Sequence, residues 1–236
     1  DEEVSRGLGD VYKRQQCAYA GAKVIISSRK INACEETANE INSNVGDEVA
    51  FPIQANIGDK TQLENLVNEA REKIGKIDVL VCNAATNPFL GSSLDIPEEA
   101  FDKIINNNIK SNHLLANLVL PEMIKRKDGV IIIISSISGF KGNEILGTYA
   151  MTKAADMALA RNLAVEFGKH NIRSNTIAPG LIKTDMAKAI WDNPDTLKTF
   201  TETNPMLRIG EPDEIGGIAV MPVSYTHLTL PTTEYV

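Results

Sequence analysis

The chain has 236 residues, of which 43% are hydrophobic and 23% are charged, a balance typical of one globular domain with a substantial core. Its formal net charge of −7 argues against nucleic acids and anionic membranes as partners, because both are themselves negative. Apolar runs are far shorter than a membrane-spanning helix requires, so the composition predicts a soluble protein.

Cysteine usage and the N-terminal residues bear on the cellular compartment. The three cysteines are odd in number and unclustered, which indicates a reducing compartment rather than a disulfide scaffold. The N-terminal residues lack the apolar stretch of a secretory signal peptide. The three histidines are too scattered to suggest a metal site. We therefore expect a cytoplasmic protein without a bound metal.

Short β-branched runs alternate with longer segments of helical periodicity along the chain. The expected strands cover residues 23–27, 49–54, 77–82, 130–135 and 173–177. The expected helices cover residues 32–42, 60–74, 98–125 and 148–168, and Gly168 suits a helix C-cap. Strands that are apolar on both faces and alternate with helices indicate a parallel sheet covered on both sides. The predicted fold is a single doubly wound α/β domain, Rossmann-like, over residues 1–236.

Small or polar residues follow each expected strand. Ligands of doubly wound sheets bind at the carboxyl ends of the strands, so these segments are candidates for one shared site. In chain order they are Ser28-Arg29-Lys30, Asn56-Ile57, Asn83-Ala84-Ala85, Ser135-Ser136 and Pro179-Gly180. Five such segments at one edge favour a binding site more strongly than any single motif does.

Ser136, Tyr149 and Lys153 form the most informative group. Ser136 follows a buried apolar run, and Tyr149 stands 13 residues later, four residues ahead of Lys153. If Tyr149 begins a helix, Lys153 lies one turn on, on the same face. A fixed positive charge beside a phenol lowers the phenol's pKa, which makes it a usable proton donor and acceptor. The alternative is a surface tyrosine and lysine that merely share a helix face.

In type and order, these residues resemble the classical short-chain dehydrogenase/reductase family over about residues 18–220. The matching pieces are Asn83-Ala84-Ala85, Asn108, Ser136, Tyr149, Lys153, Pro179-Gly180 and Thr184. The 13-residue gap between Ser136 and Tyr149 is also the spacing of that family. The strings SSRK (27–30) and NAATNPF (83–89) are similar to NADPH-dependent carbonyl reductases that act on retinal and dicarbonyls.

The resemblance implies a role for each of four catalytic residues. Tyr149 would exchange a proton with the substrate oxygen, and Lys153 would lower its pKa and bind the nicotinamide ribose. Ser136 would orient and polarise the carbonyl, although Ser135 and Ser138 offer the same chemistry nearby. Asn108, in the long helix 98–125, would hold a water for proton resupply. Alternatively, Asn108 is a helix-surface residue in a run of three asparagines.

The resemblance also implies a dinucleotide cofactor, and the residues after the first visible strand bear on its identity. Ser28, Arg29 and Lys30 include no carboxylate that would bind a ribose 2′-hydroxyl, and Arg29 offers a forked donor for a 2′-phosphate. We therefore expect NADPH to be preferred over NADH, the alternative being a solvated basic loop. The other expected cofactor contacts are Ser5, Arg6, Leu8, Asn56, Ile57, Asn83, Ala84, Ala85, Tyr149, Lys153, Pro179, Gly180, Ile182 and Thr184.

Both ends of the chain depart from the family pattern. Glu2 and Glu3 stand where that pattern has Thr and Gly, with no strand before them, and two carboxylates would repel a pyrophosphate. The residues after Val220 do not continue the pattern either. We expect that residues 1–16 and 221–236 are not native coding sequence, and that the first and last strands of the sheet are missing.

The expected activity is hydride transfer between NADP(H) and a small-molecule carbonyl or secondary alcohol. Two alternatives remain: a reductase of 3-oxoacyl thioesters on acyl carrier protein, and a non-catalytic cofactor-binding protein of the same fold. By analogy with the family, the two long helices would form a homodimer or homotetramer. The segment 184–206 would form a substrate lid, with Met186 and Trp191 as candidate substrate contacts, although their residue types favour a packing role for each.

Overall fold

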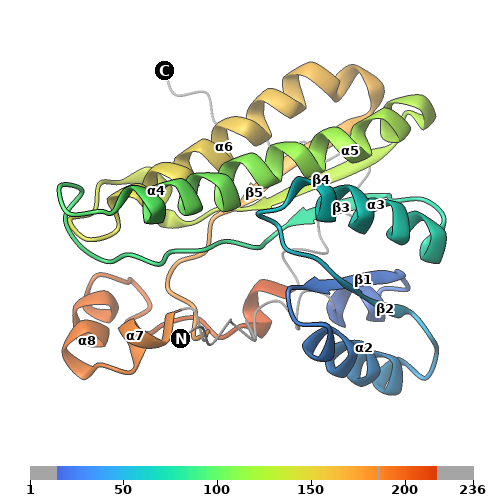
Figure 1. Cartoon of the computed structure of the whole chain (residues 1–236). Helices are drawn as coiled ribbons and strands as arrows, with labels where there is room; N and C mark the ends of the chain where they lie inside the picture. The colour runs from blue at the N-terminus through green and yellow to red at the C-terminus, as the bar shows by residue number, and fades with distance from the viewer. Residues whose placement is uncertain (1–14, 185–186, 217–236) are drawn as a thin grey trace.

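The computed structural model describes residues 15–184 and 187–216. These residues form an α/β arrangement of parallel strands and helices (Figure 1). The strands are β1 (Val24–Ser28), β2 (Ala50–Gln54), β3 (Val79–Cys82), β4 (Gly129–Ile134) and β5 (Ile172–Ile177). Each of the five expected strands is present, with ends that differ from the expected ones by one or two residues. The predicted Rossmann-like fold class is confirmed.

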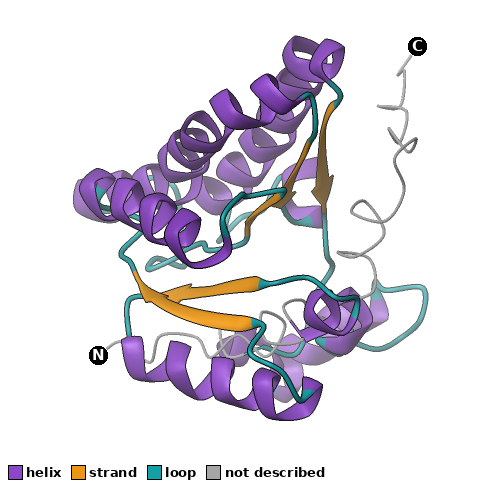
Figure 2. Cartoon of the chain, turned by 90° about the vertical axis from the view of Figure 1, so that its right-hand side faces the viewer, coloured by secondary structure: helices purple, strands orange, loops and turns teal. Residues whose placement is uncertain are grey.

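The described strands form two sheets rather than one. β1 pairs with β2, and a separate sheet has the order β3-β4-β5, with every pairing parallel. Figure 2 shows the two groups of strands as distinct layers of the molecule. Within the described residues, no strand joins β1 to β3. The expectation that the first and last strands are missing concerns residues 1–14 and 217–236, which lie outside the described part of the chain.

Strand β4 is buried on both of its faces. Ile131 and Ile133 belong to one apolar cluster, whereas Val130, Ile132 and Ile134 belong to another. The alternation follows from the two-residue repeat of a strand. The first cluster packs against α3 (Lys60–Ile74), α5 (Ser111–Arg126) and α6 (Gly147–Phe167). A strand covered in this way gives the residues that follow it a rigid support.

Strands β1 and β2 have a core of their own with α2 (Ile31–Val45). Ile26 from β1 and Ile41 from α2 are fully buried in it, together with Ala18 near the start of the described chain. Helix α2 lies beneath these strands in Figure 1, on the opposite side of the molecule from α5 and α6. Helices therefore lie on opposite sides of the two groups of strands, with α2 against β1 and β2 and with α5 and α6 against the sheet β3-β4-β5.

The expected single helix over residues 98–125 is divided into three parts. It consists of α4 (Glu98–Ile105), a π-helical turn η1 (Asn106–Lys110) and α5. A π-helical turn adds a residue to the helical repeat, and such turns are frequent at functional sites. This turn contains Asn108, which is completely buried and therefore is not a helix-surface residue.

Helix α6 ends at Phe167 and has Gly168 as its C-cap, as the sequence predicted. Gly168 keeps a right-handed conformation (φ −58°), and the chain continues into the 3₁₀ turn η3 (Gly168–His170). The left-handed residue comes at the end of that turn and is Asn171, with φ 58°. Asparagine tolerates this conformation better than most side chains.

The segment beyond β5 carries two short helices, α7 (Lys188–Trp191) and α8 (Pro194–Glu202). Trp191 is half-buried, and its indole Nε1 donates to the carbonyl of Thr184 at 2.8 Å. This contact ties α7 to the loop that follows β5. A role for the segment as a substrate lid stays a prediction, and Met186 lies outside the described residues. No described helix is both long and apolar enough to cross a membrane.

Candidate active site

Ser136 sits at the carboxyl end of β4, where the chain turns into η2 (Ile137–Phe140). Its hydroxyl caps that turn by accepting from the Ser138 amide at 3.1 Å. The neighbouring Ser135 is buried, and its hydroxyl donates to the Lys153 carbonyl at 2.7 Å. The Ser135 hydroxyl therefore helps to fix α6, whereas the Ser136 side chain is near enough to Tyr149 to lower the pKa of the phenol. Of the two serines, Ser136 is the one placed beside Tyr149, and its catalytic role stays a prediction.

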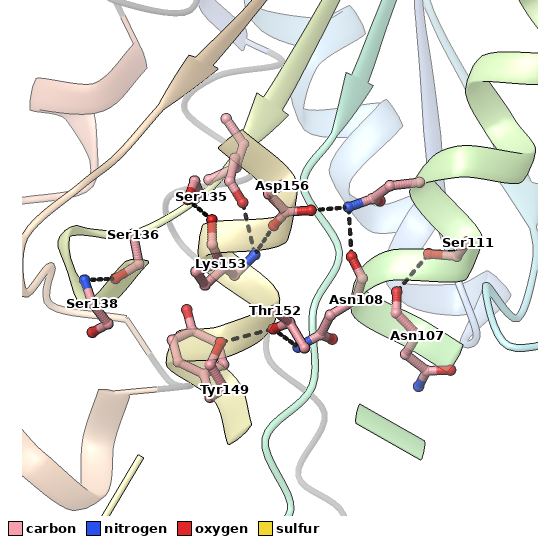
Figure 3. A network of polar contacts seen from close by, with 12 residues as sticks. Asn107, Asn108, Ser111, Ser135, Ser136, Ser138, Tyr149, Thr152, Lys153 and Asp156 are labelled. Carbon is pink, nitrogen blue, oxygen red and sulfur yellow. Dashed lines mark hydrogen bonds and ion pairs between the residues drawn. The ribbon is translucent and has the colours of Figure 1, made fainter. Parts of the chain in front are cut away.

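Tyr149 and Lys153 lie on the first two turns of α6, one above the other (Figure 3). The Lys153 Nζ atom is 5.7 Å from the centroid of the Tyr149 ring. Lys153 is almost completely buried, with 2% of its surface exposed. Its ammonium donates to the Ile134 carbonyl at 2.7 Å and to Asp156 Oδ2 at 3.0 Å. The pair is therefore part of an interior network and not of an exposed helix face.

The expected lowering of the Tyr149 pKa is wrong for this structure. Burial of the phenol raises its pKa to about 12, against an opposing hydrogen bond from Ser136, and the Asp156 carboxylate raises it further. The main physical reason is the burial of the phenol, and in addition Lys153 does not act as an isolated charge. Its positive charge is offset by a carboxylate that the sequence analysis did not include.

Asn108 holds the segment that follows β3. Its Oδ1 atom accepts from the Thr86 amide at 2.8 Å, and its Nδ2 atom donates to the Thr86 carbonyl at 3.0 Å. The same Nδ2 also donates to Thr152 Oγ1 at 3.2 Å, and Thr152 in turn donates to the Tyr149 carbonyl at 2.8 Å. Asn108 therefore fixes the loop after β3 against the helix that carries Tyr149, and Figure 3 shows its contact with Thr152 on that helix. Its expected role in holding a water stays a prediction.

Two polar residues in the network escaped the sequence analysis. Asn112 and Asp156 are buried, and Asn112 Nδ2 donates both to Asp156 Oδ1 at 2.9 Å and to the Asn108 carbonyl at 2.8 Å. A signal for both was present in the sequence. Asp156 is three residues after Lys153 and Asn112 four after Asn108, so each shares a helix face with a recognised site residue.

The π-helical turn also connects the two sheets at their carboxyl edges. Asn106 Nδ2 donates to the carbonyl of Gly58, which lies beyond β2, at 3.0 Å. Two residues later, Asn108 binds Thr86, which lies beyond β3. Residues that follow strands of different sheets are thereby brought together, and this is the arrangement that a shared ligand site requires.

Ser28 is the last residue of β1, and Arg29 follows it at that edge. The Ser28 hydroxyl accepts from the Lys30 amide at 3.2 Å and lies 3.1 Å from Cys34 Sγ on the first turn of α2. The side chains of Arg29 and Lys30 are exposed, and the Arg29 carbonyl accepts from Gln54 Nε2 at 2.8 Å. Two cationic side chains are thus presented to solvent at the end of β1.

The residues after β2 and β3 are placed as the sequence predicted, at the ends of their strands. Asn56 is half-buried, and its side chain accepts from the Gly58 amide at 3.0 Å. Ile57 packs against the main apolar cluster, so its side chain is a core contact. Ala84 is exposed and Asn83 and Ala85 are half-buried, which leaves the backbone there open to a ligand.

The remaining expected cofactor contacts follow β5 or precede the described chain. The Pro179 carbonyl accepts from the Ile137 amide at 3.0 Å, which joins this loop to η2, and Gly180 is exposed. Ile182 forms a parallel bridge with Gly210 and so anchors the segment before Thr184. Ser5, Arg6 and Leu8 lie outside the described residues.

A small hollow opens beside Tyr149. It lies between the loop after β3 and the start of α6, and its lining includes Asn87, Phe89, Ile96 and Leu146. Polar and apolar groups line it in about equal measure, and Tyr149 is one of the lining residues.

Comparisons with known proteins agree with this geometry. A family model described as enoyl-(acyl carrier protein) reductase matches residues 6–226. Dehydrogenase/reductase SDR family member 4 of Bos taurus is 38% identical over 213 residues, which cover 90% of this chain and 75% of the relative. This chain belongs to the short-chain dehydrogenase/reductase family. It is therefore related to oxidoreductases that act on alcohol and carbonyl groups with a nicotinamide cofactor.

Solved structures of short-chain dehydrogenases/reductases are similar throughout the described chain. Levodione reductase superposes with a TM-score of 0.87 at 27% identity, covering 93% of this chain and 87% of its own. A 7α-hydroxysteroid dehydrogenase in complex with NADH and 7-oxo glycochenodeoxycholic acid gives a TM-score of 0.84 at 33% identity, covering 92% and 83%. These similarities extend the family assignment from motifs to the whole architecture.

Gly139 allows η2 to approach α6 closely enough for Ser136 to meet Tyr149. A Cβ atom at Gly139 would lie 2.8 Å from the Lys153 carbonyl carbon and 2.9 Å from the Ala154 amide nitrogen. We expect Gly139→Ala to push Ser136 away from Tyr149 and to lower turnover by about 10²-fold, the loss typical of a misplacement near 1 Å. Steady-state kinetics checks this.

The matched control is Gly142→Ala in the same loop, because a Cβ atom at Gly142 meets nothing within 4 Å. That variant is expected to keep wild-type turnover. Equal activity of the two variants would show that the close approach of η2 and α6 has no part in catalysis.

Proposed function

We propose that this short-chain dehydrogenase/reductase transfers hydride between NADP(H) and a small carbonyl or secondary alcohol, with Tyr149 as general acid and base. The observation that carries the proposal is the position of the Tyr149 phenol, which lies near enough to Ser136 for that side chain to lower its pKa and which lines a small hollow. When bound, the nicotinamide supplies the hydride. A non-catalytic role would not require this combination of a buried lysine, a serine and a phenol.

Each of several residues has its own role in the proposed reaction. Tyr149 gives a proton to the substrate oxygen during reduction, and its raised pKa keeps it protonated at neutral pH. Ser136 donates to the same oxygen and fixes the carbonyl in the hollow. Lys153, Thr184 and the backbone at Asn83 and Pro179 would hold the cofactor, because they lie at the carboxyl edge where the strand ends leave small or polar groups.

The substrate class is tested by a titration followed by a panel. NADPH binding is followed by the quenching of protein fluorescence, and turnover is then measured on small ketones, α-dicarbonyls, retinal and an acetoacetyl thioester. Activity on ketones or dicarbonyls supports the proposal. Preference for the thioester would favour the acyl carrier protein reductase instead, and binding without turnover would leave a cofactor-binding protein.

The expected preference for NADPH depends on Arg29. Its guanidinium is exposed at the end of β1, and no carboxylate occupies residues 27–30. We expect Arg29→Ala to weaken NADPH binding by about tenfold or more, as the loss of a hydrogen bond to a charged group of 1.5–3 kcal/mol implies. NADH binding is expected to change little, because NADH lacks the 2′-phosphate.

The control for this measurement is Lys169→Ala, which removes an exposed cation from η3, distant in sequence from the carboxyl edge. It should leave both dissociation constants unchanged. Equal weakening of NADPH and NADH by Arg29→Ala would remove the basis for assigning NADP(H) to this chain.

We also propose a homodimer or homotetramer built on the long helices. Val165 on α6 is 86% exposed, and Met151 on the same helix and Phe101 on α4 are exposed as well. Apolar side chains that face solvent along two long helices are typical of a surface that a second subunit covers. Sedimentation or light scattering of the purified protein measures the assembly directly.

A further inference from the structure

Asp156 is a buried carboxylate to which the proposed mechanism gives no role. It lies on α6, one turn beyond Lys153, with 1% of its surface exposed. Its Oδ2 atom accepts from Lys153 Nζ at 3.0 Å, and its Oδ1 atom accepts from Asn112 Nδ2 at 2.9 Å. Both oxygens are thus engaged (Figure 3). A buried carboxylate is costly unless it is paired, so its presence calls for a functional reason.

The contacts of Asp156 determine where the Lys153 ammonium lies. One of its N–H groups points to the Ile134 carbonyl at the end of β4 and another to Asp156. The ammonium is held between the sheet and its own helix, and its Nζ atom remains 5.7 Å from the Tyr149 ring centroid. A carboxylate at hydrogen-bond distance cancels most of the field that the ammonium exerts on groups farther away.

The groups facing Asp156 come from three elements. Lys153 and Tyr149 share α6 with it, and Cys82 faces it from the end of β3. Burial raises the pKa of the Cys82 thiol to about 12, so this thiol stays neutral. Asn112, from α5, is a neutral donor. In this part of the described chain, Asp156 therefore pairs with the cation Lys153. The acid whose pKa Asp156 influences is Tyr149.

We propose that Asp156 is a positioning residue that offsets the charge of Lys153 and so keeps Tyr149 in its protonated form. This inference rests on the proposed role of Tyr149 as proton donor. It assigns to Asp156 the role of setting the pH range over which Tyr149 can donate. Asn112 supports this role by binding the second oxygen of the carboxylate and joining it to the Asn108 carbonyl. The carboxylate thus connects the catalytic helix α6 with the π-helical turn.

The test is a titration of Tyr149 in the cofactor-free protein. Phenolate absorbance is recorded against pH, and the curve of a Tyr149→Phe protein in the same background is subtracted to isolate this residue from the other four tyrosines. We expect Asp156→Asn to move the titration of Tyr149 to lower pH by about one unit or more, because Lys153 then acts as an uncompensated charge. Asp156→Glu restores the carboxylate and is expected to restore the wild-type curve.

Asp156→Ser provides a second variant if Asp156→Asn does not fold, since it leaves room for a water beside the ammonium. It is expected to shift the titration in the same direction. Unchanged titration in the asparagine or serine variant, or a shift to higher pH, would overturn the proposal. Because the measurement uses neither cofactor nor substrate, its outcome is independent of the substrate panel, which tests the proposed function itself.

Discussion

Replacing Tyr149 by phenylalanine is expected to lower turnover by about 10²- to 10⁴-fold, the contribution usual for a positioned general acid. The change removes the hydroxyl that meets Ser136 and leaves the ring in place beside Lys153. The fold and the affinity for NADPH should therefore persist. Steady-state kinetics measures the loss, and a thermal unfolding curve shows that the variant is folded.

Tyr19→Phe is the matched control for this substitution. Tyr19 is 51% exposed and lies on the N-terminal side of β1, remote in sequence from α6. Removal of its hydroxyl is expected to leave turnover unchanged. If Tyr149→Phe retained most of the wild-type rate, the proton would have to come from another group, and the assignment of Tyr149 as the acid would be wrong.

The strands and the placement of Ser136, Tyr149 and Lys153 could be predicted from the sequence because both depend on short-range patterns. Five apolar runs bounded by small or polar residues mark the strands, and each is found within two residues of its expected place. The spacing between Ser136, Tyr149 and Lys153 is likewise local, with a strand end at one side and one helical turn at the other. Such features are visible in a single chain without knowledge of what packs against them.

The direction of the Tyr149 pKa could not be predicted, since it depends on contacts made across the fold. Asp156 shares a helix face with Lys153, but its burial becomes evident only when α5 brings Asn112 against it, 44 residues away in sequence. Burial of the phenol is also a tertiary effect. The sequence analysis considered only the neighbouring charge of Lys153, which favours the phenolate. It missed the two influences that raise the pKa, namely burial of the phenol and the Asp156 carboxylate.

The interruption of the long helix at Asn106–Lys110 is a second feature that periodicity did not reveal. The run of asparagines fits an exposed helical stretch equally well, and burial arises because Asn106 and Asn108 bind loops that follow two different strands. A polar side chain at a core position is then satisfied by backbone groups. Polar residues on an otherwise apolar helix face are thus the signal that would have revealed this connection.

Of the substitutions proposed for this chain, Lys153→Met is expected to lower stability the most. It is also expected to abolish most of the activity. It leaves the Asp156 carboxylate buried without its partner, a change that costs about 3–5 kcal/mol. Burial already raises the pKa of Asp156, and loss of the ammonium removes the chief influence that lowers it. The folded variant therefore binds a proton more tightly than the unfolded chain does. Its stability should fall as pH rises, and denaturant unfolding at several pH values checks this.

The double variant Lys153→Met, Asp156→Leu separates stability from catalysis. Replacement of a buried ion pair by apolar side chains of similar volume is often neutral, so this protein should regain most of the lost stability and lose its added pH dependence. Turnover should remain as low as in Lys153→Met, because the ammonium is still absent. If the double variant is as unstable as the single one, the loss of stability arises from lost packing around Lys153. The ion pair would then not explain why Asp156 is buried beside Lys153.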